Sequence, residues 1–269
     1  MTQPVAGRWA DLMPRVLSAI AMCAIGGFEL WLGGRYFHAF VGFIVGLMVW
    51  ELVIMLAPDR RRTAICAGTV SGILMAAVFE FSTGALLPIA LGLCVVLALA
   101  IGLSVGERRR LGIAYSLVIL LGGLTLMLTR DQLGFGWIMW LVAVVIASDV
   151  AGYFAGKMLG GPKFWPAISP KKTWSGTVAG WVGAAFVGLV FGLGSGMQMV
   201  LIGLSLGLAF AAQMGDISES AIKRRCGVKD SSNLIPGHGG VLDRFDGLIG
   251  ASVAFLAFAA LTGLPVGLL

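Results

Sequence analysis

The sequence predicts an all-α protein that crosses a membrane about nine times. Of its 269 residues, 58% are hydrophobic and only 12% are charged. The mean hydropathy is +0.96, and the apolar residues fall into runs of roughly 20, the length that spans a bilayer core. Soluble domains are roughly half apolar and one quarter charged, so water is not the main solvent of this chain.

Apolar runs separated by polar breaks predict the nine helices. In chain order they lie near residues 15–33, 37–57, 64–80, 84–105, 112–129, 136–156, 176–195, 197–215 and 246–268. No small-residue cleavage pattern follows the first run, so we expect a retained helix and not a signal peptide. Two breaks, 157–175 and 216–245, are much longer than the others, and we expect both to be loops.

The cationic residues predict the orientation, because loops rich in Lys and Arg stay in the cytoplasm. Only Arg35 and Arg130 fall on one side of the nine predicted helices. The other seventeen of the nineteen cations share the opposite side: Arg8, Arg15, Arg60, Arg61, Arg62, Arg108, Arg109, Arg110, Lys157, Lys163, Lys171, Lys172, Lys223, Arg224, Arg225, Lys229 and Arg244. We therefore expect a cytoplasmic N-terminus and both long loops in the cytoplasm.

Carboxylates at the ends of the last two predicted helices indicate a metal site. Asp216 is expected to end the eighth helix, and Asp243 and Asp246 to open the ninth, so the loop between them can bring the three together. Asp149 lies inside the sixth helix, about two turns from its cytoplasmic end, and an ionisable residue within a span is functional by default. Oxygen ligands beside phosphates favour Mg²⁺. We expect Mg²⁺ here, with room for a second metal ion.

The long loops also carry groups suited to phosphate. Glycines in the run 236–240, Pro-Gly-His-Gly-Gly, let the backbone approach a ligand closely. Lys223, Arg224 and Lys229 would supply matching positive charge. His238 is either a phosphate contact or a loop histidine bonded to a neighbour. A second basic and hydroxyl-rich stretch, Ser-Pro-Lys-Lys-Thr-Trp, occupies 169–174. The two loops together predict a triphosphate site.

One long pattern resembles the signature of the phosphatidate cytidylyltransferases, also called CDP-diacylglycerol synthases. About 17 of its 27 consecutive positions are specified: Ser220-x-Ile222-Lys223-Arg224-x4-Lys229-Asp230-x-Ser232-x2-Ile235-Pro236-x-His238-Gly239-Gly240-Val241-x-Asp243-Arg244-Phe245-Asp246. The segments 148–153 and 169–174 resemble further family elements in the expected order. Ser175 stands where the family usually has Glu or Gln, so it is given no catalytic role.

The resemblance implies transfer of CMP from CTP to phosphatidate, with release of pyrophosphate and a need for divalent metal. The partners are then CTP, phosphatidate and membrane lipids, with no nucleic acid, at the cytoplasmic face of a bacterial inner membrane. The resemblance assigns catalytic roles to Asp216, Lys223, Arg224, Lys229, Asp230, Asp243, Arg244 and Asp246. It assigns substrate binding to Ser169, Lys171, Lys172, Thr173, Ser220, Ser232, Pro236, Gly237, His238, Gly239 and Gly240. It assigns metal binding to Asp149, Asp216, Asp243 and Asp246.

We expect one membrane domain, 1–269. Its catalytic half is 141–269, while 1–140 contributes topology, lipid access and oligomer contacts. The forty glycines favour close helix packing, as in Gly152-x-x-x-Gly156, which also makes a homodimer plausible. Glu29, Glu51 and Glu80 are expected to pair inside the bundle or to face an interface, with lining of the phosphatidate path as the alternative.

Two other functions stay open at this point. A CTP-dependent kinase or transferase acting on another lipid, such as a polyprenol or an archaeal ether lipid, would need similar phosphate groups. A transporter would also use acids and glycines inside its helices, but transport sites lie near the midplane, whereas most of the acids here lie at one face. The arginines of 60–62 and 108–110 are read as topology signals or contacts to anionic headgroups.

Overall fold

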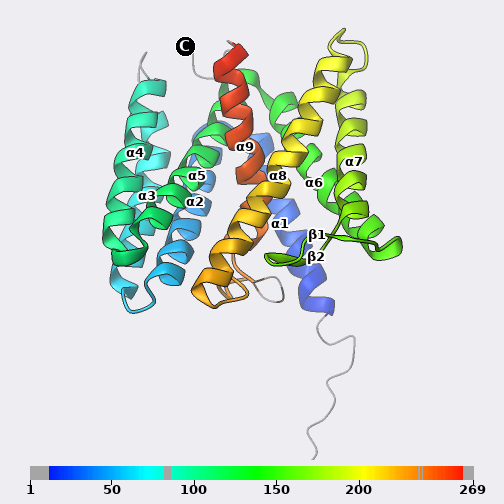
Figure 1. Ribbon diagram of the computed structural model, residues 1–269. Coiled ribbons are helices and arrows are strands. Elements are labelled where there is room, and N and C mark those ends of the chain that lie inside the picture. The colour runs from blue at the N-terminus through cyan, green and yellow to red at the C-terminus, as the bar shows by residue number, and fades with distance from the viewer. Residues whose placement is uncertain (1–11, 82–85, 236, 238, 263–269) are drawn as a thin grey trace, which may run out of the picture.

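The structure is a computed structural model that describes residues 12–81, 86–235, 237 and 239–262. Over these residues it contains nine α-helices (Figure 1): α1 (Leu12–Leu32), α2 (Gly34–Leu56), α3 (Arg61–Phe81), α4 (Leu86–Ser104), α5 (Arg109–Leu128), α6 (Phe135–Met158), α7 (Trp174–Gly192), α8 (Gln198–Cys226) and α9 (Leu242–Thr262). Eight of the helices are long and apolar enough to cross a membrane, and α1 contains a shorter apolar stretch, Ile20–Leu32. The prediction of an all-α, multi-pass membrane protein is confirmed.

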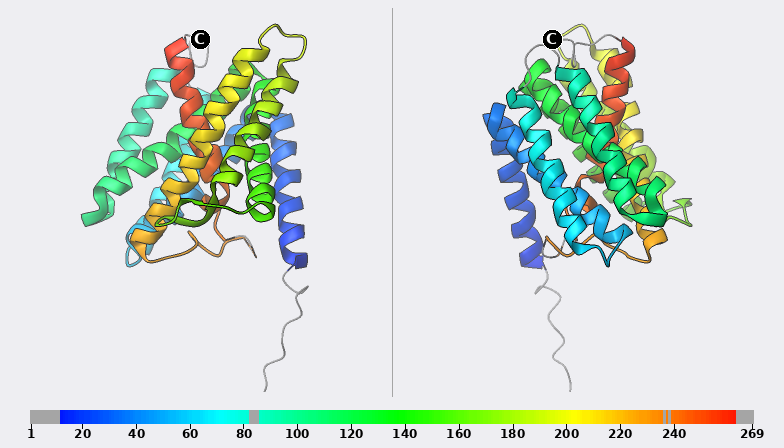
Figure 2. Two further views of the ribbon diagram at one scale, coloured as in Figure 1. Left: turned by 45° about the vertical axis from the view of Figure 1, so that its right-hand side comes forward. Right: turned by 90° about the vertical axis from the view of Figure 1, so that its left-hand side faces the viewer.

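The connections that carry most of the cations gather at one end of the helical bundle. The α2–α3, α4–α5, α6–α7 and α8–α9 connections lie at the lower end in Figure 1, where α1 also begins, and α9 finishes at the upper end. Figure 2 shows the same separation from two further directions. The distant polar segments of the sequence therefore meet at one end of the bundle.

The eighth helix is longer than predicted, and this corrects the expected loop 216–245. Helix α8 continues past Asp216 to Cys226. The apolar run stops near 215, but a helix ends where its backbone bonding ends. Three basic residues occupy the last turn of α8, and Gly227 closes it with a left-handed φ of 74°, both typical of a helix C-terminus. Asp216 therefore lies in the middle of a helix and not at its end.

The other long break, 157–175, is not an irregular loop throughout. It contains a two-stranded antiparallel hairpin of β1 (Lys163–Trp165) and β2 (Ser169–Thr173). Thr173 then acts as the N-cap of α7, because its side chain accepts a hydrogen bond from the backbone N–H of Gly176. The hairpin thereby holds the basic residues of β2 beside the start of α7.

Helices α2 and α3 cross closely through four glycines. A Cβ added to Gly68 would lie 2.5 Å from the carbonyl oxygen of Gly46, and one added to Gly46 would lie 2.8 Å from the carbonyl oxygen of Gly68. Gly42 and Gly72 meet in the same reciprocal way, at 2.6 and 2.7 Å. Glycine is required on both helices, because any side chain would push the two backbones apart.

We expect Gly68→Ala to destabilise the protein by about 1–3 kcal/mol, because the added methyl group overpacks a backbone contact. The midpoint of thermal unfolding in detergent measures this. Gly92→Ala in α4 is the matched control, since a Cβ there would have nothing within 4 Å and alanine is the better helix former. Equal midpoints for the two variants would contradict the close crossing.

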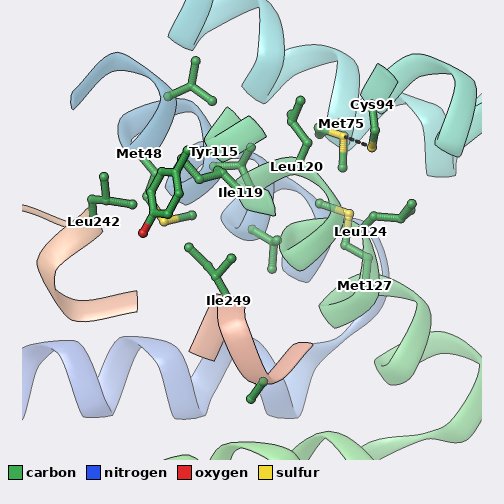
Figure 3. Packing of buried hydrophobic residues seen from close by; sticks show 14 of the residues in the cluster. Met48, Met75, Cys94, Tyr115, Ile119, Leu120, Leu124, Met127, Leu242 and Ile249 are labelled. Atoms are coloured by element: carbon green, nitrogen blue, oxygen red, sulfur yellow. Dashed lines mark hydrogen bonds between the residues drawn. The ribbon is translucent and has the colours of Figure 1, made fainter. Parts of the chain in front are cut away.

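A second close crossing joins α8 to α9. A Cβ on Gly215 would lie 2.4 Å from the carbonyl oxygen of Asp246, and one on Gly250 would lie 2.6 Å from that of Ala211. Beside this crossing, Met48 of α2 and Tyr115 of α5 lie close to Ile249 of α9 in the buried core (Figure 3). The N-terminal part of α9 is therefore packed against both halves of the chain.

Candidate active site

The crossing of α8 and α9 brings three carboxylates together at the end of the bundle that carries the cationic connections. One oxygen each of Asp216, Glu219 and Asp246 lies within 4.8 Å of the others. Glu219 is 0% exposed, and within the part of the chain that the structure describes its Oε1 has no hydrogen-bond partner. Three acids so close together repel one another unless a cation lies between them, and oxygen donors suit a hard divalent ion such as Mg²⁺. The residues present therefore fit the predicted metal.

Lys223 compensates part of this negative charge from the next turn of α8. Its Nζ forms an ion pair with Glu219 and a second with Asp243, at 2.6 Å from Asp243 Oδ1. The side chain of Lys223 is only 12% exposed, so the ammonium is largely removed from water. One cation thus faces two buried carboxylates, Glu219 and Asp243.

Asp243 lies among donors from the α8–α9 connection. Its Oδ2 accepts hydrogen bonds from the backbone N–H of Ser231 at 2.9 Å, the hydroxyl of Ser231 at 2.9 Å and the backbone N–H of Gly240 at 2.7 Å. Gly239 has a φ of +85°, and a Cβ there would lie 2.7 Å from Asp243 Oδ2. The connection therefore folds tightly around this carboxylate.

A cavity of about 480 Å³ lies beside the acid cluster, among α6, β2, α7 and α8. Its charged lining consists of Asp149, Lys157, Lys171, Lys172 and Asp216. Lys172 Nζ forms an ion pair of 2.6 Å with Asp216 Oδ2, which joins the cavity to the cluster. Ser148 also lines the cavity, and its buried hydroxyl has no hydrogen-bond partner among the described residues. The lining combines cations, hydroxyl groups and acids, which suits the binding of phosphates and a metal ion.

The structure brings together some of the predicted site residues and leaves others at the periphery. Ser220 donates a hydrogen bond to Asp216, and Ser232 donates one to Glu51. Ser169 lies on β2 beside the cavity-lining residues. The exposed members are Arg224, Lys229, Asp230 and Arg244; Gly237 lies in the connection; and Pro236 and His238 lie outside the described residues.

Two buried acids were left out of the predicted site: Glu219, and Glu51, which was expected only to pair inside the bundle, to face an interface or to line the phosphatidate path. Glu219 was placed in a loop, although Asp216, Glu219, Ser220 and Lys223 follow the i, i+3, i+4, i+7 spacing of one helical face, and that signal would have found it. Glu51 lies 165 positions before Asp216 in the chain. Its contact with the α8–α9 connection had no local signal.

Fold and side chains together define a class of protein. Carboxylates arranged for a hard cation adjoin lysines arranged for phosphates, at one end of a bundle of membrane-spanning helices. This is the arrangement of an integral membrane transferase that acts on phosphorylated substrates.

Comparison with known proteins narrows this class. A model of the cytidylyltransferase family matches residues 13–262. The chain is 35% identical over 265 residues to the phosphatidate cytidylyltransferase of Brucella suis biovar 1, which covers 95% of this chain and 96% of the relative. It is 34% identical over 272 residues to that of Pseudomonas aeruginosa, covering 94% of this chain and 100% of the relative. For the Bacillus subtilis protein of the same name, identity is 43% over 122 residues, which is 44% of this chain and 45% of the relative. This chain belongs to the cytidylyltransferase family.

Proposed function

We propose that this protein transfers CMP from CTP to phosphatidate, giving CDP-diacylglycerol and pyrophosphate for phospholipid synthesis. The convergence of Asp216, Glu219 and Asp246 beside the cationic cavity carries the proposal. Relatives named phosphatidate cytidylyltransferase, similar over nearly the whole chain, support the choice of substrates.

The reaction needs positioning more than proton transfer. A phosphate oxygen of phosphatidate attacks the α-phosphorus of CTP, and the bond from that phosphorus to the oxygen bridging to the β-phosphate breaks. Pyrophosphate leaves with the electron pair. The attacking oxygen is already anionic at neutral pH, so little general-base help is required. Alignment of two polyanions and compensation of their charge should dominate.

Asp216, Glu219 and Asp246 would hold a divalent ion, with Asp149 facing the same region from the cavity. When bound, Mg²⁺ would offset the negative charge of the triphosphate oxygens. Asp243 was also predicted as a metal ligand. Its oxygens already accept hydrogen bonds from Ser231, Gly240 and Lys223, so we assign it to positioning.

The cationic residues of the site fall into two groups, one that lines the cavity and one that is exposed farther out. Lys157, Lys171 and Lys172 line the cavity, where they would bind substrate phosphates. Farther out, Arg224, Lys229 and Arg244 are exposed, so they would meet the nucleotide as it arrives and pyrophosphate as it leaves. The remaining residues proposed to bind or orient substrate are Ser169, Thr173, Ser220, Asp230, Ser232, Pro236, Gly237, His238, Gly239 and Gly240.

We further propose that this end of the bundle faces the cytoplasm of a bacterial inner membrane. The excess of cations on its connections supports that orientation, and CTP is a cytosolic metabolite. The homodimer, the single domain 1–269 and its division at residue 140 stay predictions.

Two parallel assays test the function. Purified protein is given phosphatidate, Mg²⁺ and CTP labelled either at the α-phosphate or at the γ-phosphate. Transfer of the α-label to lipid, with the γ-label released as pyrophosphate, supports the proposal. Transfer of the γ-label to lipid would instead indicate a CTP-dependent lipid kinase. Absence of both, with substrate flux into vesicles containing the protein, would favour the transporter.

A further inference from the structure

Glu51 of α2 is a fully buried acid that binds the α8–α9 connection from the other half of the chain. Its side chain is 0% exposed. The carboxylate accepts four hydrogen bonds: from the hydroxyls of Ser231 at 3.1 Å and Ser232 at 2.6 Å, and from the backbone N–H groups of Val241 at 2.9 Å and Leu242 at 2.7 Å. All four donors lie within a stretch of twelve residues that is more than 170 positions away in sequence.

The position of this carboxylate at the start of α9 explains how its buried charge is stabilised. Leu242 is the first residue of α9, so Glu51 accepts from N–H groups that have no partner within the helix. An anion there also interacts favourably with the helix dipole. A Cβ on Gly240 would lie 2.5 Å from Glu51 Oε1 and 2.0 Å from Ser231 Oγ. A side chain at 240 would therefore have to displace the Glu51 carboxylate and the Ser231 hydroxyl.

A continuous chain of buried polar contacts runs from Glu51 to the acid cluster. The hydroxyl of Ser231 lies between two carboxylates, 3.1 Å from Glu51 Oε2 and 2.9 Å from Asp243 Oδ2. Asp243 accepts from Lys223 Nζ at 2.6 Å, and Lys223 is paired with Glu219. Glu219 in turn belongs to the cluster with Asp216 and Asp246. We call the five residues Glu51, Ser231, Asp243, Lys223 and Glu219 the relay.

We propose that Glu51 is a positioning residue for CMP transfer, which sets the geometry of the acid cluster through the relay. This inference rests on the proposed function. Among the described residues, Glu51 belongs neither to the cavity lining nor to the cluster, so we assign its effect to the residues that it holds. The 1–140 half would therefore supply part of the active-site architecture, a role beyond those predicted for it. Networks of this kind outside the ligand set orient the ligands.

Glu51→Gln tests the proposal, because glutamine keeps the size but removes the charge and one acceptor oxygen. We expect kcat to fall about 10- to 100-fold, the range found for groups that orient metal ligands. The Mg²⁺ concentration for half-maximal activity should rise, and the KM for phosphatidate should change less than either. Hydrogen–deuterium exchange of peptides covering 239–245 should become faster, which reports on the relay without any turnover. Glu51→Asp keeps the charge but loses reach, so it should recover part of kcat.

Two controls separate positioning from general stability. Glu107→Gln changes an exposed acid at the same end of the bundle, and it should match the wild type in every measurement. Ser231→Ala breaks the relay while leaving the two backbone bonds of Glu51 in place. It should reproduce the kcat and Mg²⁺ effects, and it serves in place of Glu51→Gln if that variant does not fold. In the double variant the falls in kcat should not multiply, because both changes interrupt one chain of contacts.

The outcomes are distinct. If folded Glu51→Gln or Ser231→Ala has the kcat and Mg²⁺ requirement of a wild type that makes CDP-diacylglycerol, Glu51 is a structural residue only and the inference is wrong. Lower yield or a lower unfolding midpoint with unchanged kcat leads to the same conclusion. A wild type that makes no CDP-diacylglycerol would refute the proposed function instead.

Discussion

Asp246→Asn should lower kcat/KM for CMP transfer by about 100-fold or more. Removal of one preorganised electrostatic group from an active site typically lowers the rate by about this factor. Asparagine keeps the shape of the side chain but removes the charge that Asp246 brings to within 4.8 Å of Asp216 and Glu219. Raising Mg²⁺ should restore part of the rate if the remaining acids still bind the ion weakly. Turnover across a Mg²⁺ titration measures both effects.

Asp216→Asn should behave in the same way, because Asp216 belongs to the same cluster and also pairs with Lys172. The matched control is Asp59→Asn, an exposed acid on the α2–α3 connection, which should have the wild-type rate and Mg²⁺ dependence. Wild-type behaviour in both Asp216→Asn and Asp246→Asn would remove the metal hypothesis.

Lys223→Met should have the largest effect on stability. The substitution leaves Glu219 and Asp243 as two buried carboxylates without their shared cation. Removing one partner of a buried ion pair costs about 3–5 kcal/mol, because the remaining charge is uncompensated. We expect a lower midpoint of thermal unfolding in detergent, and little or no turnover in any folded fraction.

Arg225→Met is the control for Lys223→Met, since Arg225 lies on the same last turns of α8 but is exposed. Removing its charge should leave the unfolding midpoint nearly unchanged. A midpoint for Lys223→Met equal to that of Arg225→Met would mean that Lys223 does not compensate buried charge, and the relay would lose its central contact.

Much of the fold was predictable, because a bilayer imposes a length on each apolar run. The nine predicted runs correspond to α1 to α9, and most boundaries differ by only a few residues. The clear error was the end of α8. There the helix leaves the apolar run and continues for some ten residues that are mostly polar, so hydropathy reported the end of the apolar run and not the end of the helix.

The candidate site was predictable in part. Asp216 and Asp246 were selected from their placement near the ends of two neighbouring predicted helices, and they do lie together. Glu219 was overlooked because the expected loop hid its helical spacing. Asp243 was grouped with Asp246 on the basis of i, i+3 spacing, yet its hydrogen bonds are with Ser231, Gly240 and Lys223.

By itself, the sequence determined that the helices lie in a bilayer, how many apolar runs there are, and at which end of the bundle the charges collect. These follow from composition and from the order of residues along the chain, since a bilayer acts on each segment separately. Only the tertiary structure decided which carboxylates lie close together, because that depends on the crossing of α8 and α9 at their glycines. It also revealed the bonds from Glu51 to the connection before α9. Contacts between residues so far apart leave no trace in local spacing.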